Sequence, residues 1–183
     1  MCGKTAFMCK TLHWAVGRST DRSKIYIIGD QPIDESKPIL LKRRSRFVGQ
    51  RGARILNRRN WKSSHFLFEV TEQSVNVDFV SLRFEGISAL LNFKKGLKPF
   101  STITIFKCHF RNISNDRVSG KSVIESPSTQ GFINFVVRSS TFIDIRKQMF
   151  NVTTPTLSVM IMHCIYRRIP SFEFAIVTQL MKS

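Results

Sequence analysis

The residues of this chain best suited to binding chemistry are basic and closely spaced. Between residues 42 and 62 there are nine lysines and arginines and no acidic residue. Arginine forks bind phosphate, sulfate or carboxylate groups through paired hydrogen bonds, and aromatic side chains among them offer stacking surfaces. We therefore predict a polyanion-binding site; the alternative is a solvated edge whose charges oppose aggregation. The nine residues are Lys42, Arg43, Arg44, Arg46, Arg51, Arg54, Arg58, Arg59 and Lys62.

The charge of the whole chain indicates the same class of partner. Its 29 lysines and arginines against 12 acidic residues give a formal net charge of +17. A field of that size attracts anionic glycans, nucleic acid and acidic lipid head groups, although net charge alone does not define a site. Residues 42–46 also have the composition of a nuclear-localisation signal. Nucleic acid therefore stays a second, less favoured partner.

The acidic residues and the histidines give no sign of catalysis. Twelve carboxylates in 183 residues leave little material for paired general acid–base work, or for a calcium site with several carboxylate ligands. The 4 histidines are scattered, no Cys/His spacing resembles a zinc site, and no glycine-rich phosphate loop occurs. We predict no catalytic residue, no metal and no cofactor.

Two tripeptides have the pattern of N-glycosylation sites, with acceptors at Asn112 and Asn151. They have meaning only in a secreted chain. Residues 1–17 make a poor signal peptide because charged residues interrupt the apolar stretch, yet we favour an extracellular or cell-surface location. Residues 148–166 contain no Asp, Glu, Lys or Arg, but their polar and turn residues predict a strand–turn–strand rather than a membrane span.

The elements that must position these groups are indicated by a repeat. Four stretches of the chain align without gaps: 77–87, 103–113, 135–145 and 159–169. In each, an aromatic residue stands three positions before an isoleucine. A repeat of this length is typical of a solenoid, whose units bury their apolar faces by stacking on one another. We predict that the four aromatic rings form one continuous internal pile: Phe84, Phe110, Phe142 and Tyr166.

The pattern within each unit predicts strands joined by corners. Apolar residues alternate with period two, as Val77 and Phe79 do, and the next inward position comes three residues later rather than two. The density of Val, Ile, Phe and Thr favours strands over helices, and a short second strand follows in each unit. We predict an all-β fold, a parallel β-helix over residues 24–183, with residues 1–23 as an N-terminal cap or a disordered segment.

Cys108 and Cys164 fall in one column of the aligned repeats, together with Leu82 and Ser140. A whole unit lies between the two cysteines, which places them about 2 × 4.8 Å apart in a stacked solenoid. That separation exceeds the ~7 Å limit between the Cα atoms of a disulfide. We therefore expect two free thiols that serve as small core residues.

Residues 47–55, 65–70 and 75–87 together resemble the right-handed parallel β-helix, or pectin-lyase-like, superfamily. The resemblance covers about residues 24–178 and consists of apolar columns. It implies a single-stranded right-handed solenoid, and the strand pattern of the chain gives roughly six rungs. Lyases of this superfamily typically hold calcium with acidic residues on neighbouring rungs, and hydrolases typically use two or three stacked aspartates. In the aligned repeats we find no column with two carboxylates, which argues against both activities.

Two hypotheses of function follow. The first is a non-catalytic scaffold or adhesion module whose basic face binds an anionic polysaccharide or another polyanion. The alternative is a fragment of a carbohydrate-active enzyme, a polysaccharide lyase or glycoside hydrolase, whose catalytic rungs are missing. The last strand, expected over residues 172–177, is nearly at the chain end and predicts an uncapped rung. We expect this rung either to continue in a longer protein or to pair end to end with a partner.

Overall fold

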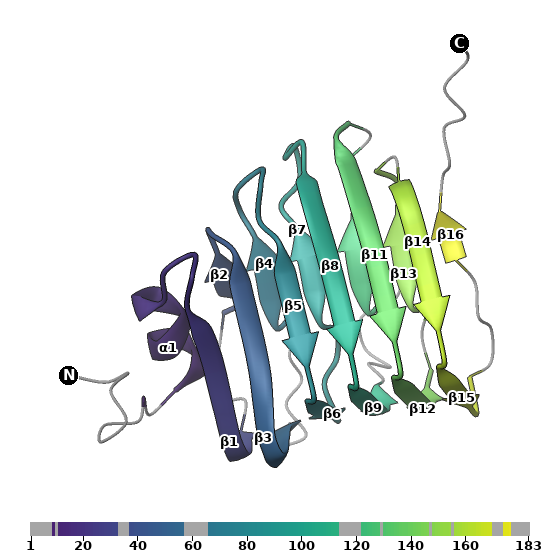
Figure 1. Ribbon diagram of the computed structural model, residues 1–183. Helices are drawn as coiled ribbons and strands as arrows, with labels where there is room; N and C mark the ends of the chain where they lie inside the picture. Colours follow the sequence, from purple (N-terminus) through teal and green to yellow (C-terminus); the bar gives the residue numbers. More distant parts are fainter. Residues whose placement is uncertain are drawn as a thin grey trace.

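The computed structural model describes residues 9, 11–32, 37–56, 66–113, 122–128, 130–146, 148–154, 156–169 and 174–176. Within these ranges the chain is nearly all β, with one short helix. The strands run parallel and form a curled sheet that is compatible with a solenoid or a β-helix (Figure 1). The predictions of an all-β chain and of parallel strand neighbours are confirmed at this level.

The strands occupy three sides of the curl, which we call sides A, B and C. Two long strands, β1 (Lys24–Pro32) and β3 (Ser45–Leu56), run through both A and B, because β3 pairs with β5 through its first residues and with β6 through its last. Side A continues with β5 (Val77–Val80), β8 (Phe100–Phe106), β11 (Phe132–Arg138) and β14 (Thr156–Met162). Side B continues with β6 (Arg83–Glu85), β9 (His109–Ile113), β12 (Thr141–Ile145) and β15 (Ile165–Arg167). Side C consists of β2 (Ile39–Leu41), β4 (Phe68–Val70), β7 (Leu91–Phe93), β10 (Ile124–Ser126), β13 (Phe150–Val152) and β16 (Phe174–Ile176).

The chain visits side A, then B, then C, and each strand pairs in parallel with the strand one circuit later. We call one circuit a rung. The first two rungs are β1 with β2 and β3 with β4, and each later rung has three strands, ending with β14, β15 and β16. In Figure 1 side A faces the viewer, side C lies behind it, and the short strands of side B join them at the bottom.

The four aromatic rings expected in one internal pile are stacked there. Phe84, Phe110, Phe142 and Tyr166 are register partners on the four consecutive strands of side B. Successive ring centroids lie 4.8, 5.0 and 5.3 Å apart, and the ring planes differ by 14°, 8° and 9°. These distances are close to the spacing of neighbouring strands in a sheet. The backbone pairing therefore sets the stack, and the prediction is confirmed.

The positions where the next inward residue comes three residues later rather than two contain residues with a left-handed backbone. The corner between sides A and B contains Ser81, Lys107, Ser139 and His163, with φ between 50° and 55°. The end of side B contains Gly86, Asn112, Asp144 and Arg168, with φ between 53° and 68°. Positive φ is strained for most residues, and it turns the chain sharply at a single position. Each corner thus changes the alternation so that apolar residues on the next side still point inward.

The core fills the inside of the curl with the inward residues of all three sides. Phe79 from side A, Phe84 from side B and Phe68 from side C are each fully buried. Cys108 is buried and Cys164 is half-buried, and both are free thiols, as the sequence predicted.

Helix α1 (Leu12–Arg18) packs against β1 and β2 at one end of the curl (Figure 1). Thr11 caps it, since the Trp14 N–H donates to Thr11 Oγ1 at 3.3 Å. Val16 is buried, and Leu12 and Ala15 pack against the core. The spacing of these three residues gives the helix one apolar face, which covers the first rung.

Candidate polyanion-binding surface

Strand β3 divides the basic cluster that the sequence predicted. One group lies before β3 and on its first residues: Lys42, Arg43, Arg44 and Arg46. A second group lies in its later part: Arg51 and Arg54. Eight residues of extended chain separate Arg46 from Arg54, a span of up to ~26 Å. The other three members fall outside the described residues: Arg58, Arg59 and Lys62.

The structure adds a residue to the first group. Lys24 on β1 is the register partner of Arg46 on β3, and both alternate with inward apolar residues. Parallel partners lie about 4.8 Å apart, although 22 positions separate these two in the sequence. Lys24 was missed because its only signal is the register of β1 against β3. We call Lys24, Lys42, Arg43, Arg44 and Arg46 the amino-terminal basic group.

Arg43 holds this group against the helix. Its Nη1 donates a hydrogen bond to the carbonyl oxygen of Ser19, the C-cap of α1, at 2.9 Å. A cation at a helix carboxyl end is favoured by the helix dipole and satisfies an otherwise unpaired carbonyl. The contact fixes the connection between β2 and β3, and with it the neighbouring basic side chains.

The charge of the amino-terminal basic group is only slightly compensated. Arg44 Nη2 lies 3.5 Å from Asp78 Oδ2, and the Arg44 side chain is 55% exposed, so this ion pair is weak. Within the described part of the chain no carboxylate pairs with Lys42 or Arg46. Arg46 Nε is buried without a hydrogen-bond partner. Tyr26 is exposed on β1, two residues from Lys24, and offers a stacking surface beside the charges.

The second group is compensated. Arg54 Nε and Nη2 donate to the two carboxylate oxygens of Asp30 at 2.8 and 2.7 Å, and Glu85 lies 4.0 Å from Arg54 Nη1. The hydrogen bond and the charge of Asp30 raise the pKa of Arg54 further. This bidentate pair joins β1 to β3. Arg54 therefore acts within the fold, and only Arg51, exposed at the corner, remains for a ligand.

His109 on β9 is the register partner of Arg83 on β6, so the two residues share one column of side B. Its pKa is lowered by partial burial and by the charges of Arg83 and Arg111, while Glu85 acts in the opposite direction. A lowered pKa keeps the imidazole neutral at pH 7. His109 therefore adds no charge to a polyanion site at that pH.

Side C carries a column that the sequence analysis missed. Glu69, Asn92, Glu125 and Asn151 are consecutive register partners and point outward from β4, β7, β10 and β13. Our prediction that no column holds two carboxylates is therefore wrong. The aligned repeats cover sides A and B only, and the short second strands of side C supply this column. The Ser122 N–H donates to Glu125 Oε1 at 2.8 Å and so holds one of the two carboxylates in place.

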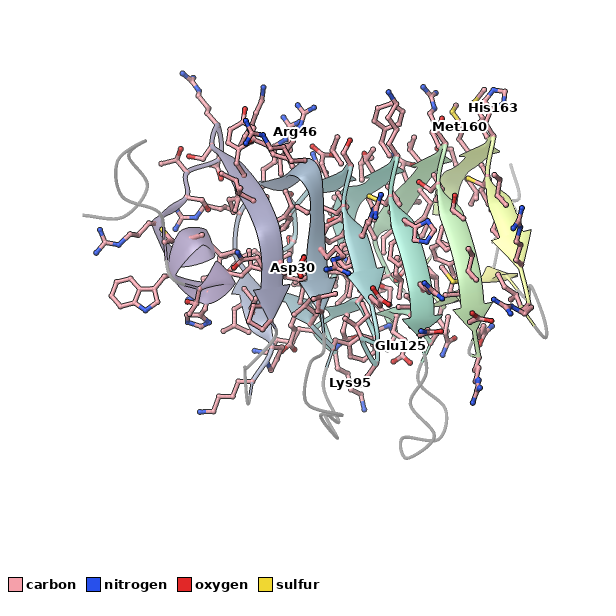
Figure 2. All side chains as sticks on the ribbon, turned by 90° about the horizontal axis from the view of Figure 1, so that it is seen from below. Asp30, Arg46, Lys95, Glu125, Met160 and His163 are labelled. Atoms are coloured by element: carbon pink, nitrogen blue, oxygen red, sulfur yellow. The ribbon has the colours of Figure 1, made fainter. Side chains whose placement is uncertain are left out.

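The amino-terminal basic group and the carboxylate column of side C lie on opposite sides of the molecule. Figure 2 shows Arg46 and Met160 on one side and Glu125 on the other, with Asp30 between them and toward the viewer. The positively charged surface is thus side A at its first rungs, and the central column of side C has no lysine or arginine among its described members.

The two sequons differ in their surroundings. Asn112 is exposed at a corner with φ 53°. Asn151 is half-buried within the column of side C, between Glu125 and a residue of β16. Thr153 of the second sequon donates to the carbonyl oxygens of Ser126 and Ser128 at 3.0 and 3.2 Å. Of the two, Asn112 is the more accessible acceptor.

In the described part of the chain, no three His, Cys, Asp or Glu side chains come together as a metal site requires. None of the helices described there combines the length and hydropathy of a membrane-spanning segment. No protein-family model, curated protein or solved structure matches the chain.

Proposed function

We propose that this chain is a right-handed parallel β-helix of the pectin-lyase-like kind that acts as a non-catalytic binding module. Its ligand is an anionic polysaccharide or another polyanion, bound through the amino-terminal basic group. Support for the fold comes from parallel pairing, stacked rings and one-residue corners. Support for the ligand class comes from the high positive charge.

One observation carries the binding proposal. Lys24 and Arg46 are neighbours on adjacent rungs, and Arg43 fastens the connection that holds Lys42 and Arg44 beside them. The group therefore presents two cations at a spacing set by the sheet and two more on a connection that Arg43 fastens, with one weak ion pair among its described members. Preorganised cations lose little conformational entropy when they bind a chain of sulfates, carboxylates or phosphates.

The proposal is tested by removing three of these charges and comparing a matched control. The variant K42Q/R44Q/R46Q lowers the net charge by three, and K94Q/K95Q/K98Q lowers it equally in the exposed connection between β7 and β8. We expect the first variant to elute from immobilised heparin and from polygalacturonate at much lower salt than the wild type. The control variant should elute close to the wild type. Equal losses in both variants would show that only the total charge matters, and would overturn the assigned surface.

Binding measurements on the wild type also decide between a glycan and a nucleic acid as the ligand. We expect stronger binding to a sulfated or uronate polymer than to DNA or RNA at equal ionic strength. Binding should weaken steeply with salt in either case, because counterions are released. On duplex DNA each lost phosphate contact lowers the slope of log K against log salt by about 0.9, so the triple variant reveals how many of the three side chains touch the ligand. Tighter binding to nucleic acid would replace the glycan proposal.

The column on side C favours a second candidate, a piece of a glycoside hydrolase. Glu69 and Glu125 stand two rungs apart with Asn92 between them, a backbone separation of about 2 × 4.8 Å. Inverting glycosidases place their two carboxyl groups about 6.5–9.5 Å apart, one as acid and one as base. Release of reducing ends from polysaccharides that is lost in E69Q and in E125Q, but kept in E72Q, would support this candidate. Glu72 is an exposed carboxylate outside the column, and absence of any hydrolysis by the wild type removes the candidate.

A further inference from the structure

We propose that side B carries a second anion site, in which Arg83, His109 and Arg111 bind the phosphate group of a phosphate monoester. The site is separate from the amino-terminal basic group and does not rest on the polyanion proposal. Side B faces the viewer in Figure 2. Arg83 lies on β6, and the other two residues lie on β9. Both strands are in the middle of the sheet, with a paired strand on each edge.

The register of β6 and β9 brings the three side chains together. His109 is the register partner of Arg83, and Arg111 follows His109 by two positions, so it points to the same outward face. The backbone distances are about 4.8 Å from Arg83 to His109, about 6.7 Å from His109 to Arg111 and about 8 Å along the diagonal. Side chains as long as arginine meet across such distances.

The two arginines are exposed, and in the described part of the chain neither forms an ion pair with a carboxylate. The acidic residues around this face are already engaged. Asp30 binds Arg54, Asp144 binds Arg168, and Glu85 lies 4.0 Å from Arg54. Uncompensated like charges on adjacent strands repel each other, so a bound anion would relieve a repulsion that the free protein carries.

His109 is half-buried between the two arginines. Burial is the first cause of its lowered pKa, and the charges of Arg83 and Arg111 are the next two. Both guanidinium groups therefore act on the imidazole. The Arg83 side chain leans toward the corner of β3, where its guanidinium carbon lies 3.9 Å from the position that a Cβ atom on Gly52 would take. Because this side chain is exposed, rotation about its bonds brings the guanidinium to an anion at His109.

The site fits one compact anion rather than a chain of them. On the next strand, β12, the register partners of His109 and Arg111 are Thr141 and Ile143, which carry no charge. On the preceding strand, β3, Arg54 is neutralised by its carboxylate partner. The half-buried Thr141 hydroxyl adds a donor. A phosphate monoester, with a charge of about −1.5 to −2 at pH 7 and three acceptor oxygens, matches two guanidinium forks and an imidazole.

Binding at this site should depend on pH. A dianion favours the imidazolium form of His109, so it raises a pKa that is lowered in the free protein. The charged groups around the imidazole are Arg83, Arg111, Lys107 at the corner two residues before it, and Glu85, which acts in the same direction as the ligand. Affinity for an anion of constant charge should rise as the pH falls through the pKa of His109 in the complex. It should level off below the pKa of His109 in the free protein.

The first test is a titration of the full chain with glucose 6-phosphate, followed by the ring signals of His109 in NMR spectra. We expect R83Q and R111Q each to weaken binding by at least about tenfold, because each removes a charge-assisted hydrogen bond. R167Q removes the same charge in the column of Arg111 two rungs away, and it should bind nearly as the wild type does. Unchanged His109 signals in the wild type, or equal losses in R111Q and R167Q, would overturn the inference.

Glucose 6-sulfate is the matched ligand, because it has the same sugar and a tetrahedral group of smaller negative charge. We expect it to bind more weakly than glucose 6-phosphate at pH 7.5, and equal or tighter binding would contradict a phosphate site. The variant K42Q/R44Q/R46Q should bind glucose 6-phosphate as the wild type does. Loss of binding in that variant would show that the ligand occupies the amino-terminal basic group instead.

The last test uses inorganic sulfate, whose charge stays constant between pH 5 and pH 8. An opposite charge close to an ionisable group shifts its pKa by about one unit or more. The wild type should therefore bind sulfate more tightly at pH 5 than at pH 8, by up to about tenfold. H109Q keeps a side-chain donor but cannot become charged, and it should lose this dependence. The same dependence in H109Q would remove His109 from the site. Circular dichroism establishes that each variant is folded.

Discussion

The middle rungs and the last rung of this molecule are built from the same columns, yet they differ in environment. Phe110 and Tyr166 occupy one aromatic pile, but Phe110 is 0% exposed and Tyr166 is 36% exposed. Phe110 has a ring above and below it, whereas the described residues place a ring on only one side of Tyr166. The comparison teaches that a repeat sets the position of a side chain, while its burial depends on neighbours on both sides.

The largest effect should come from emptying the pile in its middle. F110A removes a ring that is fully enclosed, so we expect a loss of about 3–5 kcal/mol in the free energy of unfolding. Y166A removes a ring that already contacts solvent and should cost about 1–2 kcal/mol. Denaturant unfolding of both variants measures the two losses. Equal losses would mean that the last rung is as closed as the middle ones.

A second contrast concerns the thiols of one column. Burial raises the pKa of the Cys108 thiol from 9.0 to about 12. The folded protein therefore keeps this proton where the unfolded chain loses it. The neutral thiol adds to the free energy of unfolding, and this contribution is complete below pH 9. It is lost as the pH rises from 9 toward 12, by up to about 1.4 kcal/mol per pH unit.

Replacing Cys108 by serine, the residue that already stands in this column at position 140, should remove that slope. C164S, on the half-exposed last rung, should leave it. Urea unfolding between pH 8 and pH 10 gives both slopes. An unchanged slope in C108S would show that other groups cause the alkaline destabilisation.

The corner residues allow a smaller test of the same comparison. Lys107 and His163 have nearly the same backbone, φ 53° in each case, on a middle rung and on the last rung. A β-branched residue is strongly disfavoured at positive φ, so K107V should cost about 1–2 kcal/mol. H163V should cost less, because the last rung can relax away from the sheet. K107N, which tolerates this conformation, serves as the control for loss of the lysine and should be nearly neutral.

The smallest effect is expected from the ion pair that ties the last rung to the one before it. Arg168 Nε and Nη2 lie 2.7 and 2.9 Å from the Asp144 carboxylate oxygens, but the Arg168 side chain is 72% exposed. D144N keeps a residue that tolerates positive φ, and it should cost about 0.2–1 kcal/mol. The more enclosed pair of the first rungs, broken in D30N, should give the larger loss. Thermal unfolding of both variants checks this order.

The sequence predicted strands on all three sides, but it set the register on sides A and B only. One repeat of eleven residues runs through sides A and B together, so its recurring aromatic sets their register, and the predicted pairs Phe84 to Phe110 and Phe110 to Phe142 are the observed ones. The described strands of side C have three residues each. So short a segment carries too little pattern to be aligned alone, and the column of Glu69 and Glu125 was missed for that reason.

The basic cluster shows the opposite error. Its members are contiguous in sequence, and contiguity suggested one surface. An extended strand moves the chain about 3.3 Å per residue, whereas a neighbouring strand lies about 4.8 Å away. Arg54 is therefore far from Arg46, while Lys24, distant in sequence, lies beside it.

By itself the sequence determined which residues point inward, where the corners fall and which rings stack, because these depend on a local period that repeats. Only the tertiary structure decided which charges share a surface and which carboxylates share a column. Those properties depend on contacts between rungs, and the length of each connection, not the local pattern, sets which residues meet.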